Sequence, residues 1–212
     1  MPESQSQLGA DRWVLEKFPA GHKGFFVDVG AADGFSISNT LLLEQQGWSG
    51  LAIDAFPRNF EKRLNTMVEQ AVVAAEGGEF VNFVVPTHYR DFSGIERNLG
   101  KHRDALNQVE INRIVLQTRV LEDILNYHQA PSVIDYLNLD IEGSEFEVLR
   151  TFPFDKYRFR LITVEHNFEE PKRTMIHDLL VANGYVRERE VLWDDWYRLV
   201  EEKIGYDEVT NC

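Results

Sequence analysis

The sequence predicts an α/β protein with a doubly wound, mostly parallel sheet and helices on both faces. Short apolar runs typical of buried strands alternate along the chain with segments typical of helices. The first apolar run leads directly into a glycine-bounded turn, in the segment GFFVDVGAADG at 24–34. The last two apolar segments, Tyr185–Leu192 and Trp196–Val200, are close enough in the chain to form an antiparallel pair. Together these observations predict strand–helix units closed by a hairpin.

The first half of the chain alternates in this way. Strands are expected at Phe25–Val29, Leu51–Ile53 and Gln70–Ala75, followed by a β-rich run at Glu79–Val85. We expect a helix over Ser36–Gln46, because Ser36 or Ser38 can cap its N-terminus and Gly47 can end it. Pro57 is expected to open a second helix, since a missing N–H costs nothing at the first helical position.

The second half continues the pattern after an irregular stretch. Strands are expected at Ile111–Val120, Val133–Leu139 and Phe159–Val164, and helices at Leu121–Tyr127, Gly143–Arg150 and Lys172–Ala182. Residues 86–110 are predicted to form a lid or an acceptor-binding loop. No linker rich in proline and glycine divides the 212 residues, so we expect one domain over 1–212 with an N-terminal segment at 1–23.

Composition limits the classes of partner. The net charge is −13, from 22 basic and 35 acidic residues, which disfavours binding to nucleic acid phosphates. No apolar run is long enough to cross a bilayer, and the polar N-terminus lacks a signal-peptide core. The single cysteine is Cys212, so no intrachain disulfide can form. We expect a cytoplasmic protein with no membrane partner; a homo-oligomer stays open.

Acidic residues end the first two strands, where ligands bind in open α/β sheets. Asp28 and Asp54 in these places are typical of proteins that hold a nucleoside-bearing cofactor. A dinucleotide site would carry G-x-G-x-x-G, but the turn at 30–34 lacks the middle glycine, and Asp33 would meet the diphosphate. The pattern therefore favours S-adenosylmethionine, a cation without phosphate. The alternative is that the two acids only cap strands.

These segments resemble the FkbM family of S-adenosylmethionine-dependent methyltransferases. The resemblance runs from Ser6 to Arg198, through SQLGAD at 6–11, GFFVDVGAADG at 24–34, SNTLLLEQQGWSGLAIDAFP at 38–57, IDYLNLDIEGSEFEVLRTFPF at 134–154, ITVEHN at 162–167 and the later NGY and DDWYR. It implies a Rossmann-like, seven-stranded methyltransferase sheet whose last strand is antiparallel.

The resemblance also implies which residues surround the cofactor. They are Asp28, Gly30, Ala32, Gly34, Asn39, Asp54 and Asp140. Ala32 stands where related sequences often carry asparagine, and Ala55-Phe56 stands where Glu-Pro-Asn is usual. We add Ala55 and Phe56 to the predicted cofactor contacts; Phe56 either stacks on the adenine or is a core aromatic.

The ends of the fourth and fifth strands supply the groups for chemistry beyond the donor. If these strands are neighbours, Asp140 and Glu165, with His166 or Asn167, can converge on a divalent cation, most simply Mg²⁺. This arrangement resembles the metal sites of catechol and macrolide-sugar O-methyltransferases. A ligating His166 would shift the preference towards Mn²⁺, Fe²⁺ or Zn²⁺.

A metal-free alternative makes His166 the general base, since its reference pKa lies near neutrality. Asp140 and Glu142 then complete the predicted catalytic set, although Glu142 also suits a helix N-terminus. A third interpretation is that Glu165 and His166 only tie neighbouring loops together.

The sequence thus favours methyl transfer from S-adenosylmethionine to a hydroxyl oxygen of a sugar, polyketide or other small metabolite. Methylation of nitrogen, or of a larger glycan or a nucleic acid, is the first alternative. A cofactor-binding scaffold without transfer activity is another, and a dinucleotide-dependent oxidoreductase is the last.

Overall fold

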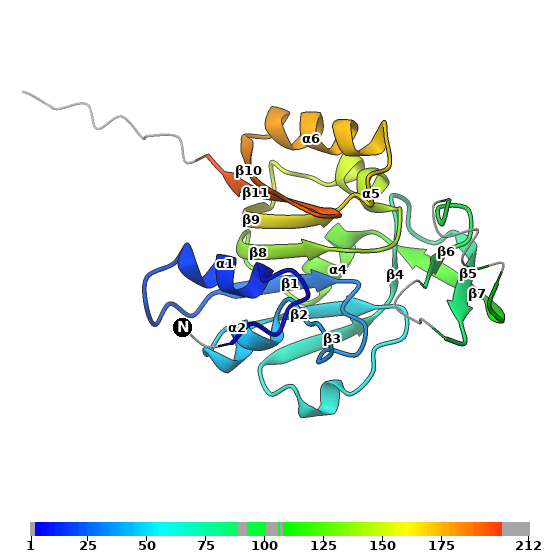
Figure 1. Cartoon of the computed structure of the whole chain (residues 1–212), viewed down its shortest axis with the longest axis horizontal. Helices are drawn as coiled ribbons and strands as arrows, with labels where there is room; N and C mark the ends of the chain where they lie inside the picture. The colour runs from blue at the N-terminus through cyan, green and yellow to red at the C-terminus, as the bar shows by residue number, and fades with distance from the viewer. Residues whose placement is uncertain (1–2, 89–92, 101–105, 107, 201–212) are drawn as a thin grey trace, which may run out of the picture.

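A computed structural model describes residues 3–88, 93–100, 106 and 108–200. Its centre is a seven-stranded sheet (Figure 1). The strands are β1 (Phe25–Val29), β2 (Ser49–Asp54), β3 (Thr66–Gln70), β8 (Val133–Leu139), β9 (Arg158–Glu165), β10 (Tyr185–Val191) and β11 (Asp194–Leu199), in the spatial order β10-β11-β9-β8-β1-β2-β3. Strands β3, β2, β1, β8 and β9 pair in parallel, whereas β11 is antiparallel to both of its neighbours. The predicted α/β class, with a mostly parallel sheet, is confirmed.

Helices bury the two faces of this sheet in separate hydrophobic clusters, because successive side chains of a strand point to opposite faces. Phe26 of β1 belongs to a cluster with α1 (Ala10–Glu16) and α2 (Leu41–Gln45). Its neighbours Val27 and Val29 belong to the larger cluster. That cluster takes in α4 (Leu121–Tyr127), α5 (Glu145–Thr151) and α6 (Lys172–Ala182). The edge at which the parallel strands end is the usual place for a ligand-binding site in such a sheet.

A smaller sheet stands beside that edge, to the right in Figure 1. Its strands are β4 (Val72–Val73), β5 (Phe80–Pro86), β6 (Gly94–Ile95) and β7 (Ile111–Arg119), in the order β4-β7-β5-β6. Strand β5 pairs antiparallel with β7 over its whole length, from Phe80 opposite Gln117 to Pro86 opposite Ile111. Val81, Phe83 and Ile95 form the apolar inner face. This sheet supplies a second wall for whatever binds at the edge.

Several predicted boundaries were wrong. The helix expected over 36–46 is shorter, because residues 36–40 form turns in which the Ser38 hydroxyl accepts the N–H of Leu41 at 3.1 Å. The helix expected after Pro57 is only a 3₁₀ turn, η1 (Phe60–Lys62). The strand expected over 70–75 is divided between β3 and β4.

Two further expectations concern the segments around the site. The predicted N-terminal segment contains α1, which the sequence analysis did not anticipate. The predicted lid, 86–110, lies partly outside the described residues, and its described part includes β6. Within the described ranges, no helix has the length and apolarity that a membrane crossing requires.

Candidate functional site

A cavity of about 540 Å³ lies at the carboxyl edge of the parallel strands, between the main sheet and the smaller one. Phe83, Val85, Asn112 and Ile114 of the smaller sheet form part of its wall. All the predicted cofactor residues except Gly34 line it, namely Asp28, Gly30, Ala32, Asn39, Asp54, Ala55, Phe56 and Asp140. The position expected from the ends of the apolar runs is therefore where the hollow lies.

Asp28 holds neighbouring side chains in place at the base of the cavity. Its carboxylate accepts hydrogen bonds from the Thr40 hydroxyl at 2.7 Å and from the Asn138 amide nitrogen at 3.0 Å. The Asn138 amide oxygen in turn accepts the Asn39 amide N–H at 3.0 Å. Burial raises the pKa of Asp28, and these hydrogen bonds oppose that rise. Asp28 thus fixes the orientation of two amides that line the cavity.

Asp54 joins the two loops that follow β1 and β2. One carboxylate oxygen accepts the N–H of Ala32 at 2.8 Å, and the other accepts the N–H of Phe56 at 2.7 Å. Burial raises the pKa of Asp54, although both backbone hydrogen bonds lower it. Each carboxylate oxygen has a further lone pair that can accept a hydrogen bond from a bound ligand. Asp54 can therefore shape the cavity and bind within it.

Gly30 allows the loops after β1 and β8 to touch. Its φ is +87°, and a Cβ built there would lie 1.6 Å from the carbonyl oxygen of Asp140. Its N–H donates to the carbonyl of Ile53 at 2.8 Å, which ties the turn after β1 to the neighbouring strand β2. Gly34, with φ +69°, instead packs against the ring of Phe60, where a Cβ would lie 2.7 Å away. Gly34 shapes the turn without lining the cavity.

Asp33 does not line the cavity, contrary to its expected place against a diphosphate. Its carboxylate accepts the N–H groups of Phe35 at 2.9 Å and Ser36 at 2.8 Å, together with the Ser36 hydroxyl at 2.8 Å. Short side chains of this type stabilise turns by bonding to the backbone that follows them. Asp33 therefore stabilises the turn that leads towards α2.

Carboxylates from β8, α5 and β9 meet beside the cavity. Asp140, Glu145 and Glu165 each offer an oxygen, and these oxygens lie within 4.8 Å of one another. Burial, with the repulsion between the acids, raises the pKa values of Asp140 and Glu165 well above their usual range. Burial also raises the pKa of Glu145 to about 7, even though Glu145 accepts the N–H groups of Ile141 and Gly143. One oxygen of Glu165, Oε2, is buried without a hydrogen-bond partner.

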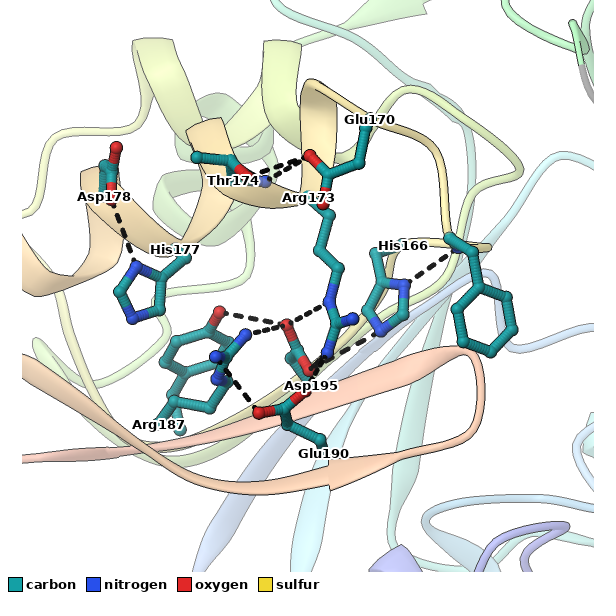
Figure 2. Close-up of polar contacts among 11 residues, drawn as sticks. His166, Glu170, Arg173, Thr174, His177, Asp178, Arg187, Glu190 and Asp195 are labelled. Carbon is teal, nitrogen blue, oxygen red and sulfur yellow. Dashed lines mark hydrogen bonds and ion pairs between the residues drawn. The ribbon is translucent and has the colours of Figure 1, made fainter.

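His166 has a different environment from the one expected for a base or a metal ligand. Its Nδ1 accepts the N–H of Phe168 at 2.9 Å, and its Nε2 lies 3.5 Å from a carboxylate oxygen of Asp195 (Figure 2). Asp195 also accepts hydrogen bonds from Arg173 at 2.8 Å and Arg187 at 3.0 Å. Neither His166 nor Glu165 is among the residues that line the 540 Å³ cavity, whereas Glu142 is. Within the described residues, Glu145 replaces His166 in the group with Asp140 and Glu165.

A comparison with models of known protein families identifies the family of this chain. The family model described as "Methyltransferase FkbM domain" matches residues 28–199, which cover most of the chain and nearly every residue discussed above. The chain belongs to the FkbM methyltransferase family. A search of curated proteins found no match.

In this FkbM methyltransferase, sequence reasoning missed several residues that line the cavity or approach it. Asn138 and Glu145 stand in the same motif as Asp140, so only their roles were overlooked. Asp194 lines the cavity because β11 pairs antiparallel with β9 and sets Asp194 opposite Glu165. Burial raises its pKa to about 6. No local pattern in the sequence gives that register.

Proposed function

We propose that the protein transfers a methyl group from S-adenosylmethionine to a small acceptor bound in the 540 Å³ cavity. The observation that carries this proposal is the place of the cavity, at the ends of β1, β2 and β8 and within the matched methyltransferase domain. Ligands of open α/β sheets bind at this edge. Bound S-adenosylmethionine supplies an electrophilic methyl group on a sulfonium sulfur.

The two ends of the cavity differ in chemistry, which supports one orientation of the donor. At the β2 end, Asp54 can accept hydrogen bonds from ribose hydroxyls, and Phe56 offers an apolar face beside Phe83, with ring centroids 5.8 Å apart. At the β8 end, Asp140 and Asp194 offer carboxylates. Carboxylates suit the cationic part of the donor, so we place the nucleoside at Asp54 and the methyl group towards Asp140.

The acids at the β8 end can also act on the acceptor. For a hydroxyl acceptor, a group at the β8 end must take up the proton, and a carboxylate with a raised pKa is a stronger base than an ordinary one. Burial raises the pKa of Asp194 to about 6, which suits a base that works near neutral pH. We propose a neutral hydroxyl-bearing acceptor such as a sugar, a polyketide or another small metabolite. The acidic lining and the net charge of −13 disfavour nucleic acid.

We further propose that a divalent cation binds beside the cavity. The group of Asp140, Glu145 and Glu165 presents only oxygen ligands, which Mg²⁺ prefers, and the buried Oε2 of Glu165 has no hydrogen-bond partner. A cation held there would draw acceptor oxygens towards Asp140 and lower the pKa of a bound hydroxyl. Without a cation, Asp140 and Glu165 are hydrogen-bonded to each other.

Calorimetric titration with S-adenosylhomocysteine tests the donor site. We expect one binding site in the wild-type protein and an affinity at least about tenfold weaker in Asp54→Ala, a loss of about 1.4 kcal/mol, because the hydrogen bonds that Asp54 accepts are removed. Asp155→Ala, at an exposed carboxylate that does not line the cavity, should bind as the wild type does. Binding of NADH in place of S-adenosylhomocysteine would reject the donor. Binding without turnover of any acceptor would favour a scaffold.

The metal is tested by binding alone, after dialysis against EDTA. We expect Mg²⁺ or Mn²⁺ to bind the wild-type protein, and Glu165→Gln and Glu145→Gln to weaken binding by about tenfold or more, as expected when a charged ligand is lost. His166→Gln should retain the wild-type affinity. The reverse pattern, with His166→Gln defective and Glu145→Gln intact, would restore the ligand set expected from the sequence. No heat of binding in the wild-type protein would reject the metal.

A further inference from the structure

The segment SQLGAD at 6–11 carried part of the family resemblance, yet the proposed function does not use it. Asp11 is fully buried, and its carboxylate is surrounded by donors from the preceding residues. The N–H groups of Gln5 and Ser6 donate to it at 2.6 and 3.1 Å. The hydroxyls of Ser4 and Ser6 donate at 2.6 and 3.3 Å. The chain before α1 is therefore fastened to the first turn of that helix.

This fastening forces residues 7–9 into a loop, which we name the N-terminal strap. Gly9 makes the reversal, because its φ is +80° although a Cβ there would meet nothing within 4 Å. The positive φ, and not a lack of space for a side chain, is therefore what favours glycine at this position. Gln7 and Leu8, which lie between the tied residues and Gly9, both line the 540 Å³ cavity.

The strap packs against the part of the main sheet formed by β1, β8, β9 and β11. Leu8 packs against the cluster whose sheet residues are Phe26 of β1, Tyr136 of β8, Leu161 of β9 and Trp196 of β11. Asp54 and Gln70 also line the cavity. They lie at the ends of β2 and β3, which are on the opposite side of β1 from β8. Since we place the nucleoside at the β2 end, the strap faces the part of the cavity that Asp140 and Asp194 line.

Gln7 brings a different chemistry to that end. Gln7 is exposed, and within the described part of the chain its side-chain amide makes no hydrogen bond. An amide offers two N–H donors and one carbonyl acceptor, whereas ionised carboxylates only accept. Gln7 can therefore donate hydrogen bonds to hydroxyl or ether oxygens of a ligand at that end.

We infer that the N-terminal strap is the acceptor-recognition element of this enzyme, and that Gln7 donates hydrogen bonds to a neutral, polyhydroxylated acceptor. Asp11 is the positioning residue that holds the strap in reach of it. The inference rests on the proposed function, because it takes the methyl acceptor to bind beside Asp140. It adds the class of acceptor and the residue that selects it.

The test uses methyl α-glucopyranoside as a minimal polyol probe, with the full chain saturated with S-adenosylhomocysteine. Saturation-transfer NMR should detect the probe on the wild-type protein. In Gln7→Ala we expect its affinity to fall about fivefold, the size of one lost hydrogen bond, while affinity for S-adenosylhomocysteine changes less than about twofold. Gln45→Ala, at an exposed glutamine of α2 outside the cavity lining, should match the wild type in both measurements.

Asp11→Asn tests whether Asp11 holds the strap in place, whereas Gln7→Ala tests whether Gln7 contacts the probe. Faster hydrogen exchange of the Gln5 and Ser6 amides, together with weaker probe binding, is expected, because both amides donate to the replaced carboxylate. Equal probe affinity in Gln7→Ala and the wild type, or no probe binding to the wild type, would overturn the inference. So would a parallel loss of affinity for S-adenosylhomocysteine, which would place Gln7 on the donor. If S-adenosylhomocysteine fails to bind the wild type at all, the proposed function itself fails.

Discussion

Gly30 and the carbonyl of Asp140 lie where the loops after β1 and β8 meet at the cavity. The N–H of Asp140 also donates to the carbonyl of Val29 at 3.0 Å, so the loops are held together from both sides. There is no room for a methyl group at this crossing. The position of Asp140 in the cavity therefore depends on the absence of a side chain at Gly30.

Gly30→Ala should therefore be far more costly than an ordinary substitution of a glycine with positive φ. Gly21 is the matched control, because its φ of +82° is nearly the same and its Cβ would meet nothing within 4 Å. We expect Gly21→Ala to lower the free energy of unfolding by about 1 kcal/mol, and Gly30→Ala by about 3 kcal/mol or more. Urea unfolding measures both. Equal losses would show that the loops can separate without cost.

At this scale the sequence located residues well and assigned their contacts poorly. Asp28, Asp54 and Asp140, each predicted from its place at the end of an apolar run, all line the cavity. Asp33 and His166 stand in equally suggestive places, but their side chains bond to the adjacent backbone and to Asp195. The direction of a side chain after a strand depends on the local turn, which a run of apolar residues does not specify.

Strand β11 is held against α6 and β10 by the buried carboxylate of Asp195. Arg173 of α6 and Arg187 of β10 converge on it, as does the ring of His166 (Figure 2). Because neighbouring residues of a strand point to opposite faces, this contact sets Asp194 towards the cavity. An ion-pair network on one face of β11 thus positions an acid on the other.

Asp195→Asn tests this network through its pH dependence. Burial would raise the pKa of Asp195, but hydrogen bonds from His166, Arg173 and Arg187 lower it far below the usual value. The folded protein then binds fewer protons than the unfolded chain, so this stabilisation is complete above about pH 5 and is lost as the pH falls below about 4. We expect Asp195→Asn to be about 3 kcal/mol less stable at pH 7, with a gap that narrows in acid.

Glu190→Gln is the control for that experiment, since Glu190 also pairs with Arg173 but is largely exposed. Exposed pairs contribute about 1 kcal/mol or less. A gap for Asp195→Asn that stays constant from pH 7 to pH 3 would mean that the carboxylate is not held ionised by its neighbours.

Among the elements, the strands of the main sheet could be predicted and several connections could not. The apolar run at 70–75 was assigned to one strand, but Val72 packs in the cluster of the small sheet and Val73 in the main core. These residues are apolar because they are buried in two different clusters, and not because they form a strand of the main sheet. Helix α1 was overlooked although Ala10, Trp13 and Val14 have helical spacing, because the polar residues before them dominated the segment.

At the scale of the whole molecule, the cavity links two sheets that pair with each other nowhere in the described residues. Its walls come from the main sheet through Asp54 and Asn138 and from the smaller sheet through Phe83 and Ile114. A ligand that fills it contacts both sheets at once. The sequence predicted β structure at 79–85 and 111–120, but not that these strands pair with each other. Partners so far apart in the chain leave no local pattern.

A ligand that spans both sheets should stabilise the whole fold. At a concentration of S-adenosylhomocysteine about 100 times its dissociation constant, linkage gives about 2.7 kcal/mol. For a chain of this size we expect a rise in Tm of about 5–10 °C, seen by calorimetry as one transition. A second, ligand-independent transition would show that one of the sheets unfolds without contact to the ligand.

Strand β10 closes one end of the main sheet, and charges run along it without a break from Arg187 to Glu190. Arg189 approaches Glu16 at 3.6 Å, and Glu188 pairs with Lys17 at 2.5 Å, so α1 shares this ionic border. An incoming strand from another copy would have to break these pairs and desolvate the charges before it could hydrogen-bond to the backbone. The border therefore protects a long open edge from aggregation.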